Sequence, residues 1–302
     1  MVGGRGARRG AVVGTVAIIV GLGALSLGAA RPAAPANTSP TPVLYLDLGA
    51  SVSRGVQPTK AVPTGQPTQR GYANRLVTLE RARGVDLRLT ELGCPGESLA
   101  TMLHGPDPCY LAPDTQLSDA VAFLRAHHRA RTLVTIDMGF NTLDVCFRGV
   151  DIDAACVTPV LATLRTQLRS VVATLQRAAG PSVHFVGLNH YNPYLVKGAK
   201  EGVKEVFAAN SVTALTRMNQ VFDQVYRAAG IPVADVEGAF HEDNIRLIAV
   251  AGQKEKVPAN VVYECRFTWM CAARPYGPNI HPTDAGYVAI AHAILAVLPR
   301  RW

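Results

Sequence analysis

A regular alternation of short buried runs with longer amphipathic segments most constrains how this chain folds. Four of the short runs are mainly apolar and residues 86–92 alternate apolar with polar residues; their length of about four to eight residues is typical of strands. We expect such strands at residues 43–48, 86–92, 132–138, 183–188 and 232–236. Apolar residues recur at helical spacing in the segments 71–83, 117–127, 157–175, 212–226 and 285–298. Strands separated by helices predict an α/β fold of three layers, in which a parallel sheet has helices on both faces.

Composition excludes two broad classes of protein. Apolar residues make up 48% of the 302 residues and charged residues 17%, a mixture that supports a large core and excludes disorder over the whole length. The net charge is +8. Arg5, Arg8, Arg9 and Arg31 contribute four of these charges within a segment that contains no acid. The remaining basic residues are scattered, so we expect no nucleic-acid partner.

The first 36 residues have the pattern of an export signal. Three arginines precede residues 11–30, which carry no charge. This apolar stretch fits a secretory signal peptide, and it also reaches the length of about 20 residues that a membrane-spanning helix needs. Both alternatives stay open: residues 1–36 are a cleaved signal peptide or an N-terminal membrane anchor. Residues 37–42 then form a linker, residues 43–302 form one domain, and the domain is either secreted or held at the outer face of the cytoplasmic membrane.

Six cysteines in an exported chain favour disulfide bonds. Three pairs lie close together in sequence, each within one connecting segment: Cys94 with Cys109, Cys146 with Cys156, and Cys265 with Cys271. Zinc is the alternative, but the chain has no CxxC spacing and no histidine at zinc-finger distance from a cysteine. We therefore expect three disulfides, no metal and no cofactor.

Four separate segments are expected at the carboxyl ends of the strands, where ligands bind in parallel sheets. Ser51 follows the first strand, Gly96 the second and Asn141 the third, and His281 stands just before the last helix. These residues supply a nucleophile, a base and hydrogen-bond donors for an oxyanion. Acyl transfer through a serine requires this combination. Taken singly, each residue is more often a cap or a turn residue.

In their order and spacing the four segments resemble the motifs of the SGNH/GDSL hydrolase family, and in particular its secreted bacterial esterases and lipases. The resemblance extends over residues 43–298. It implies a sheet of five parallel strands in flavodoxin-like order. It also implies that Ser51 attacks an ester carbonyl after His281 takes its proton. The backbone N–H groups of Ser51 and Gly96 and the side-chain amide of Asn141 would form the oxyanion hole.

Three acidic positions of the family pattern are replaced in this chain. Ala50, Thr142 and Pro278 stand where the family usually has an acid. We expect the backbone carbonyl of Pro278 to orient His281 in place of the missing carboxylate. The replacements also leave two alternative functions open. One is a weakened or inactive module that binds envelope lipid or glycan, and the other is an acyltransferase that uses the same serine.

The substrate is the least determined part of this interpretation. Export favours an ester-containing small molecule, a lipid or an acylated glycan as the partner, and the basic charge favours association with a membrane surface. The segment 240–276 is long for a connection, so it forms either a lid or acyl pocket or a structural loop held by Cys265 and Cys271. We expect a monomer.

Overall fold

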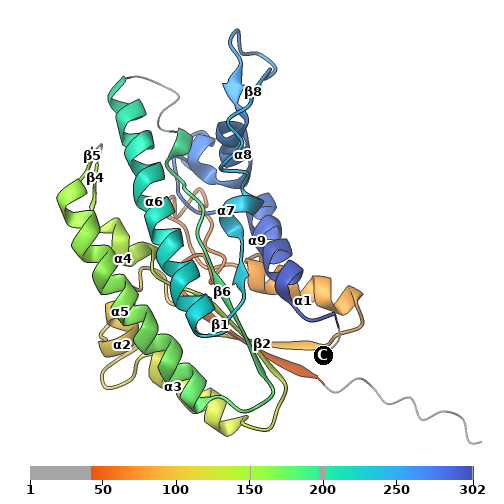
Figure 1. The fold of residues 1–302 in the computed structure, drawn as a ribbon. Helices are drawn as coiled ribbons and strands as arrows, with labels where there is room; N and C mark the ends of the chain where they lie inside the picture. The colour runs from red at the N-terminus through yellow and green to blue at the C-terminus, as the bar shows by residue number, and fades with distance from the viewer. Residues whose placement is uncertain (1–41, 150, 197–201, 301) are drawn as a thin grey trace, which may run out of the picture. The chain divides into compact units, whose positions relative to one another are not determined.

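A five-stranded parallel sheet forms the centre of the computed structural model (Figure 1), which describes residues 42–149, 151–196, 202–300 and 302. The strands are β1 (Val43–Gly49), β2 (Leu87–Glu91), β3 (Thr132–Asp137), β6 (Val183–Leu188) and β7 (Val233–Ala234). Their order is β2-β1-β3-β6-β7, and all four pairings are parallel. The predicted α/β fold and the flavodoxin-like strand order are therefore confirmed. Residues 1–36 and most of the linker at 37–42 lie outside the described residues.

Side chains alternate across the sheet and create two cores. Leu46 and Leu48 of β1 are buried in one core, while Tyr45 of the same strand is buried in the other. In Figure 1, α3, α5 and α6 cover one face, and α1 and α9 cover the other. The bounds of these helices are α1 (Tyr72–Ala82), α3 (Gln116–Ala126), α5 (Ala154–Ala178), α6 (Gly202–Ala228) and α9 (Asp284–Val297). Both faces of the sheet are covered because its strands carry apolar side chains on both sides.

Several short elements lie between these helices and strands, and the periodicity of the sequence does not predict them. Most are too short to show a helical or strand period. They are α2 (Leu99–His104), α4 (Phe140–Asp144), α7 (Val236–Ala239), α8 (Ala259–Phe267), the 3-10 helix η2 (Trp269–Cys271), and the small hairpins of β4 (Phe147–Arg148) with β5 (Asp151–Ile152) and β8 (Leu247–Ile248) with β9 (Val257–Pro258).

Each of the three disulfides closes a loop within one connection of the fold. The bonded pairs are Cys94–Cys109, Cys146–Cys156 and Cys265–Cys271, as the spacing in the sequence predicts. None of these bonds crosses between strands of the central sheet. None of the helices in the described part of the chain is long and apolar enough to cross a membrane.

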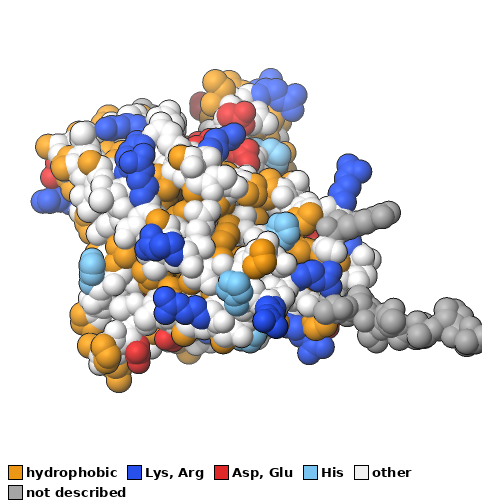
Figure 2. All heavy atoms as spheres, turned by 60° about the horizontal axis from the view of Figure 1, so that its bottom comes forward, with side chains coloured by type: hydrophobic (Ala, Val, Ile, Leu, Met, Phe, Trp, Pro, Cys, Tyr) orange, Lys and Arg blue, Asp and Glu red, His pale blue; other side chains and the backbone are white. Residues whose placement is uncertain are grey.

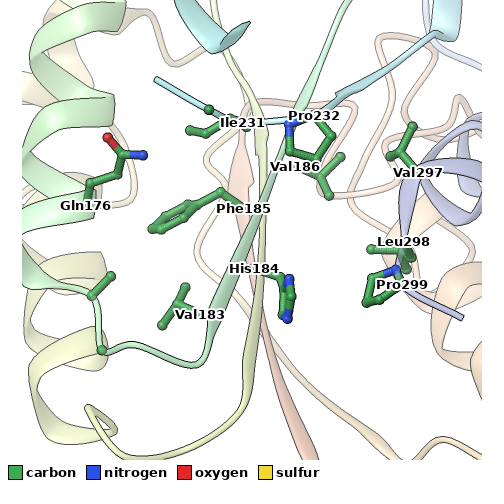
Figure 3. Close-up of a pocket in the computed structure, with 13 residues that line it drawn as sticks. Gln176, Val183, His184, Phe185, Val186, Ile231, Pro232, Val297, Leu298 and Pro299 are labelled. Carbon is green, nitrogen blue, oxygen red and sulfur yellow. The ribbon is translucent and has the colours of Figure 1, made fainter. Parts of the chain in front are cut away.

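The strand β6 has an open edge along its first half, because β7 pairs only with Gly187 and Leu188. A hollow of about 350 Å³ lies beside this edge. Figure 3 shows Val183, Phe185 and Pro232 around it, together with Leu298 at the end of α9. The hollow lies at the amino end of β6, and its lining contains no serine or cysteine. It therefore has no nucleophile for acyl transfer.

Candidate active site

Ser51 lies in a tight turn directly after β1. Residues 51–55 form turns, and the backbone N–H of Val56 donates to the carbonyl of Ser51 at 3.1 Å. The turn packs closely against the next connection. A Cβ atom at Gly93 would lie 2.0 Å from Oγ of Ser53, so only glycine fits at position 93. This close packing fixes the position of the half-buried Ser51 relative to the segment after β2.

The backbone at the end of β1 is held by the fully buried side chain of Gln116, from the first turn of α3. The N–H of Gly49 donates to Oε1 of Gln116 at 2.9 Å, and Nε2 of Gln116 donates to the carbonyl of Gly49 at 2.9 Å. Nε2 also donates to the carboxyl of Glu97. Burial raises the pKa of Glu97 to about 9, and nearby Asp107 adds to the shift, so Glu97 is neutral at pH 7.

Asn141, which follows β3, is joined to the hydrogen-bond network of Gln116 and Glu97. It lies in the first turn of α4, and its Nδ2 donates to the carbonyl of Glu97 at 2.9 Å. An amide nitrogen has two N–H groups, so one remains for a ligand. Gly96 has a φ of +88°, a backbone conformation that favours glycine. Thr142, at one of the replaced acidic positions, accepts a hydrogen bond at Oγ1 from the N–H of Leu99 at 3.1 Å.

His281 is oriented by the side chain of Asn279. Oδ1 of Asn279 lies 2.7 Å from Nδ1 of His281 and also accepts from the backbone N–H of His281 at 3.0 Å. In turn, Nδ2 of Asn279 donates to the carbonyls of Pro63 and Thr64 at 3.0 and 3.2 Å. Because an amide oxygen only accepts, Nδ1 carries the ring proton and Nε2 has the lone pair. The sequence predicted that the carbonyl of Pro278 would orient the ring, whereas the structure places Asn279 at Nδ1.

Hydrogen bonds join the His281 segment to the loop that follows Ser51. Tyr287 donates its hydroxyl to the carbonyl of Val56 at 2.8 Å, and Nε2 of Gln57 donates to Oδ1 of Asp284 at 2.8 Å. Burial lowers the pKa of the half-buried His281 to about 4. The ring is therefore uncharged at neutral pH, which is the state that a general base needs.

A small hollow of about 20 Å³ brings Ser51 and Asn141 together. Neither Gly96 nor His281 lines it. Its lining consists of Ala50, Ser51, Val52, Asp137, Gly139, Phe140, Asn141 and His190. No residue of the segment 240–276 lines the hollow, so the expectation that this segment supplies an acyl pocket gains no support here.

Asp137 and His190 line the hollow without having been predicted as site residues. Burial raises the pKa of Asp137 to about 7 and lowers the pKa of His190 to about 4. Asp137 has one visible signal in the sequence, since it is an acid at the end of an otherwise uncharged strand. Asp47, within the same sheet, is also buried, and burial raises its pKa to about 8.

Within the described part of the chain, one group of possible metal ligands gathers in space, namely Cys94, Asp107 and Cys109. Cys94 and Cys109 are bonded to each other. A disulfide has no thiolate to offer a metal, so this group does not form a metal centre.

The carboxyl edge of the parallel sheet brings Ser51 and Asn141 to one hollow, and Asn279 orients His281 in the segment before α9. The chain matches the sequence model of the GDSL-like Lipase/Acylhydrolase family over residues 48–289, and it belongs to that family. This membership supports ester-hydrolase activity in general. Comparison with curated protein sequences finds no match.

Solved structures with the same fold include several bacterial lipases and esterases. The extracellular lipase from Streptomyces rimosus is 19% identical with a TM-score of 0.50, and the alignment covers 83% of this chain and 99% of the lipase. Phospholipase A1 from Streptomyces albidoflavus is 19% identical with a TM-score of 0.52, and the alignment covers 84% of this chain and 99% of the phospholipase. An acetylxylan esterase from Geobacillus stearothermophilus is 16% identical with a TM-score of 0.50, and the alignment covers 84% of this chain and 93% of the esterase. At these identities the likeness concerns the fold.

We predict that Gln116→Ala weakens both stability and turnover. The substitution leaves the N–H of Gly49 buried without a partner, which costs about 1–3 kcal/mol, and leaves the carbonyl of Gly49 with only the N–H of Cys94 as a donor. Urea unfolding and active-site-titrated turnover of an activated ester measure the two effects. Gln220→Ala, on the exposed side of α6, is the matched control. Unchanged stability and turnover in Gln116→Ala would show that the network does not hold the turn.

We predict that Asn279→Asp shifts the acidic limb of the pH dependence of kcat/KM to higher pH. A carboxylate at Nδ1 favours the charged imidazolium, so the pKa of His281 rises from about 4 towards its ordinary value. The acid limb of kcat/KM should follow it to higher pH. Asn210→Asp, on the surface of α6, is the control for the added charge. A profile that coincides with that of the unsubstituted protein would contradict the assignment of His281 as the base.

Proposed function

We propose that this protein is an exported serine esterase or lipase that hydrolyses carboxylic esters through an acyl-enzyme on Ser51, with His281 as the base. The observation that carries the proposal is the small hollow at the carboxyl edge of the sheet, which Ser51 and Asn141 both line. Family membership supports the reaction type. The neutral ring of His281, with Nδ1 directed at Asn279, leaves Nε2 to accept a proton.

In this mechanism, Oγ of Ser51 attacks the ester carbonyl while Nε2 of His281 takes the hydroxyl proton. The negative charge that develops on the carbonyl oxygen is stabilised by the backbone N–H groups of Ser51 and Gly96 and by Nδ2 of Asn141. One such donor is typically worth about 10²- to 10³-fold in turnover. His281 then protonates the departing alcohol. Water, activated by the same nitrogen, releases the acid and restores Ser51.

The three disulfides support export, because such bonds persist in oxidising compartments and are rare in the cytosol. The pattern of residues 1–36 is consistent with this placement. The names of the proteins with similar folds include an extracellular lipase, a phospholipase and an acetylxylan esterase. These names support a lipid or an acylated glycan as the ester-containing partner.

We further propose that the end of the sheet opposite Ser51 rests on an anionic surface. Residues 125–131 connect α3 to β3 at the amino end of that strand, and they carry three arginines, two histidines and no acid. Figure 2 shows this end of the molecule, with blue and pale blue side chains spread across it and few red ones. Exposed Arg177 and His184 lie near the amino end of β6. Asp86, just before β2, pairs with Arg88 at 2.9 Å.

We predict that a fluorophosphonate serine probe labels the domain of residues 37–302 and that Ser51→Ala and His281→Ala each abolish labelling. Oγ of Ser51 forms the covalent bond to phosphorus, and His281 activates that oxygen by taking its proton. Gel fluorescence and peptide mass spectrometry measure the label. Ser170→Ala, on the exposed side of α5, is the control. A well-folded domain that remains unlabelled would favour the non-catalytic binding module.

We predict that the domain binds vesicles containing anionic phosphatidylglycerol and that the double variant Arg125→Gln/Arg129→Gln binds about tenfold or more weakly. Each Lys or Arg near an anionic surface contributes about 1 kcal/mol. Cosedimentation at low and high salt measures the affinity. Lys254→Gln/Lys256→Gln removes the same charge from the exposed β8–β9 hairpin and is the matched control. Equal loss in both variants would contradict a specific docking face.

A further inference from the structure

An acidic residue borders the hollow that Ser51 and Asn141 line. Asp137 is the last residue of β3 and stands in register with Gly49, the last residue of β1, so it lies beside the turn of Ser51. Asp137 lines the hollow as well. The volume of about 20 Å³ has room for one water-sized group. Polar groups around so small a space face the same atom, and in the proposed mechanism this atom is the carbonyl oxygen of the ester.

The carboxyl group of Asp137 is buried without a full set of partners. Asp137 is 8% exposed, and no group in the described part of the chain forms a hydrogen bond with its buried Oδ2. Burial without a partner is unfavourable for a carboxyl group, and far more so when the group is charged. Burial therefore raises the pKa of Asp137 to about 7. The protonated form has an O–H donor, which the carboxylate lacks.

The titratable groups around Asp137 supply no positive charge at neutral pH. Burial raises the pKa of Asp47 on β1 to about 8, and it lowers the pKa of His190, which also lines the hollow, to about 4. Five buried tyrosines on the surrounding elements are neutral too, because burial raises the pKa of each. They are Tyr45 on β1, Tyr72 on α1, Tyr191 after β6, Tyr226 on α6 and Tyr287 on α9. None of these groups is a cation that would favour the carboxylate.

We propose that Asp137 is a further catalytic residue, whose protonated carboxyl group donates a hydrogen bond to the carbonyl oxygen of the ester as that oxygen becomes negative. The inference rests on the proposed function of Ser51. Oγ of Ser51 bonds to the carbonyl carbon and its proton passes to His281, while the O–H bond of Asp137 stays intact. Once ionised, Asp137 has no proton to donate, and its negative charge repels the oxyanion. The protonated form is therefore the active one.

The experiment measures kcat/KM of the full chain for p-nitrophenyl butyrate between about pH 5 and pH 9, with the rate of Ser51→Ala subtracted. In the unsubstituted protein we expect a fall of up to about tenfold for each pH unit above about 7. Asp137→Asn keeps an N–H donor and does not ionise, so its kcat/KM should not fall there and should exceed that of the unsubstituted protein at about pH 9. An equal fall in Asp137→Asn, with Ser51 still labelled by the fluorophosphonate, would overturn the inference and leave the proposed function standing.

Asp47→Asn is the matched control, because it neutralises another buried carboxyl group of the sheet that does not line the hollow. Oδ1 of Asp47 accepts from the hydroxyls of Tyr72 and Thr135 at 2.8 and 2.6 Å, and an asparagine oxygen accepts in the same way. The alkaline fall should remain in this variant. Its loss there as well would indicate a general effect of buried charge and contradict a specific role of Asp137.

A second variant removes the donor. In Asp137→Leu we expect kcat/KM for each labelled site at about pH 6 to be about 10²-fold lower, with no alkaline fall, because one oxyanion donor is worth about that much. Counting labelled sites separates this loss from a loss of folded protein. Turnover equal to that of Asp137→Asn would overturn the inference. Loss of both labelling and turnover in the unsubstituted protein would overturn the proposed function with it.

Discussion

The candidate site depends on the pair of hydrogen bonds by which Gln116 holds the backbone of Gly49. A strand end leaves an N–H and a carbonyl without ladder partners, and burying them unpaired is costly. The side chain of Gln116 binds both groups, the carbonyl also accepting from the N–H of Cys94 at 3.0 Å, and it joins α3 to the end of β1. Gln116 also donates to the neutral carboxyl group of Glu97, and the backbone carbonyl of Glu97 accepts a hydrogen bond from Nδ2 of Asn141. The turn of Ser51 and the first turn of α4 are thus parts of one hydrogen-bonded unit.

The replaced acids have structural explanations at two positions. Asn279 occupies the place at Nδ1 of His281 where a carboxylate would stabilise the imidazolium. An amide fixes the tautomer and the orientation of the ring, but it adds no charge, which leaves burial to determine the low pKa of His281. Thr142 accepts from the N–H of Leu99 at the start of α2. Through this hydrogen bond Thr142 holds the start of α2, just after the segment that contains Gly96.

Much of the fold could be predicted from the sequence, because runs such as 43–48 and 132–138 are mainly apolar on both faces of a strand, and a sheet covered on both faces buries such runs. The short helix α4 could not be predicted, because its five residues are too few to show a helical period of apolar residues. Ser51, Gly96, Asn141 and His281 were candidates because each follows a strand or precedes the last helix. Gln116 and Glu97 were missed, since their contacts join positions far apart in the chain, and polar residues in a helix usually face solvent. The contact of Asn279 with His281 is also not predicted, because an uncharged amide gives no signal in the sequence that it replaces a carboxylate.

The three disulfides have a consequence for where the protein can work. Each closes a short loop, with sequence separations of 15, 10 and 6 residues, in segments that contain Gly96, follow Asn141 or precede His281. Crosslinks of this kind restrict local freedom and leave the order of the strands to the hydrophobic cores. A chain kept reduced would still have its sheet, but its reactive edge would be loosely held. With the export proposed above, formation of these bonds outside the cytosol would act as the final maturation step, separating assembly of the scaffold from competence of the site.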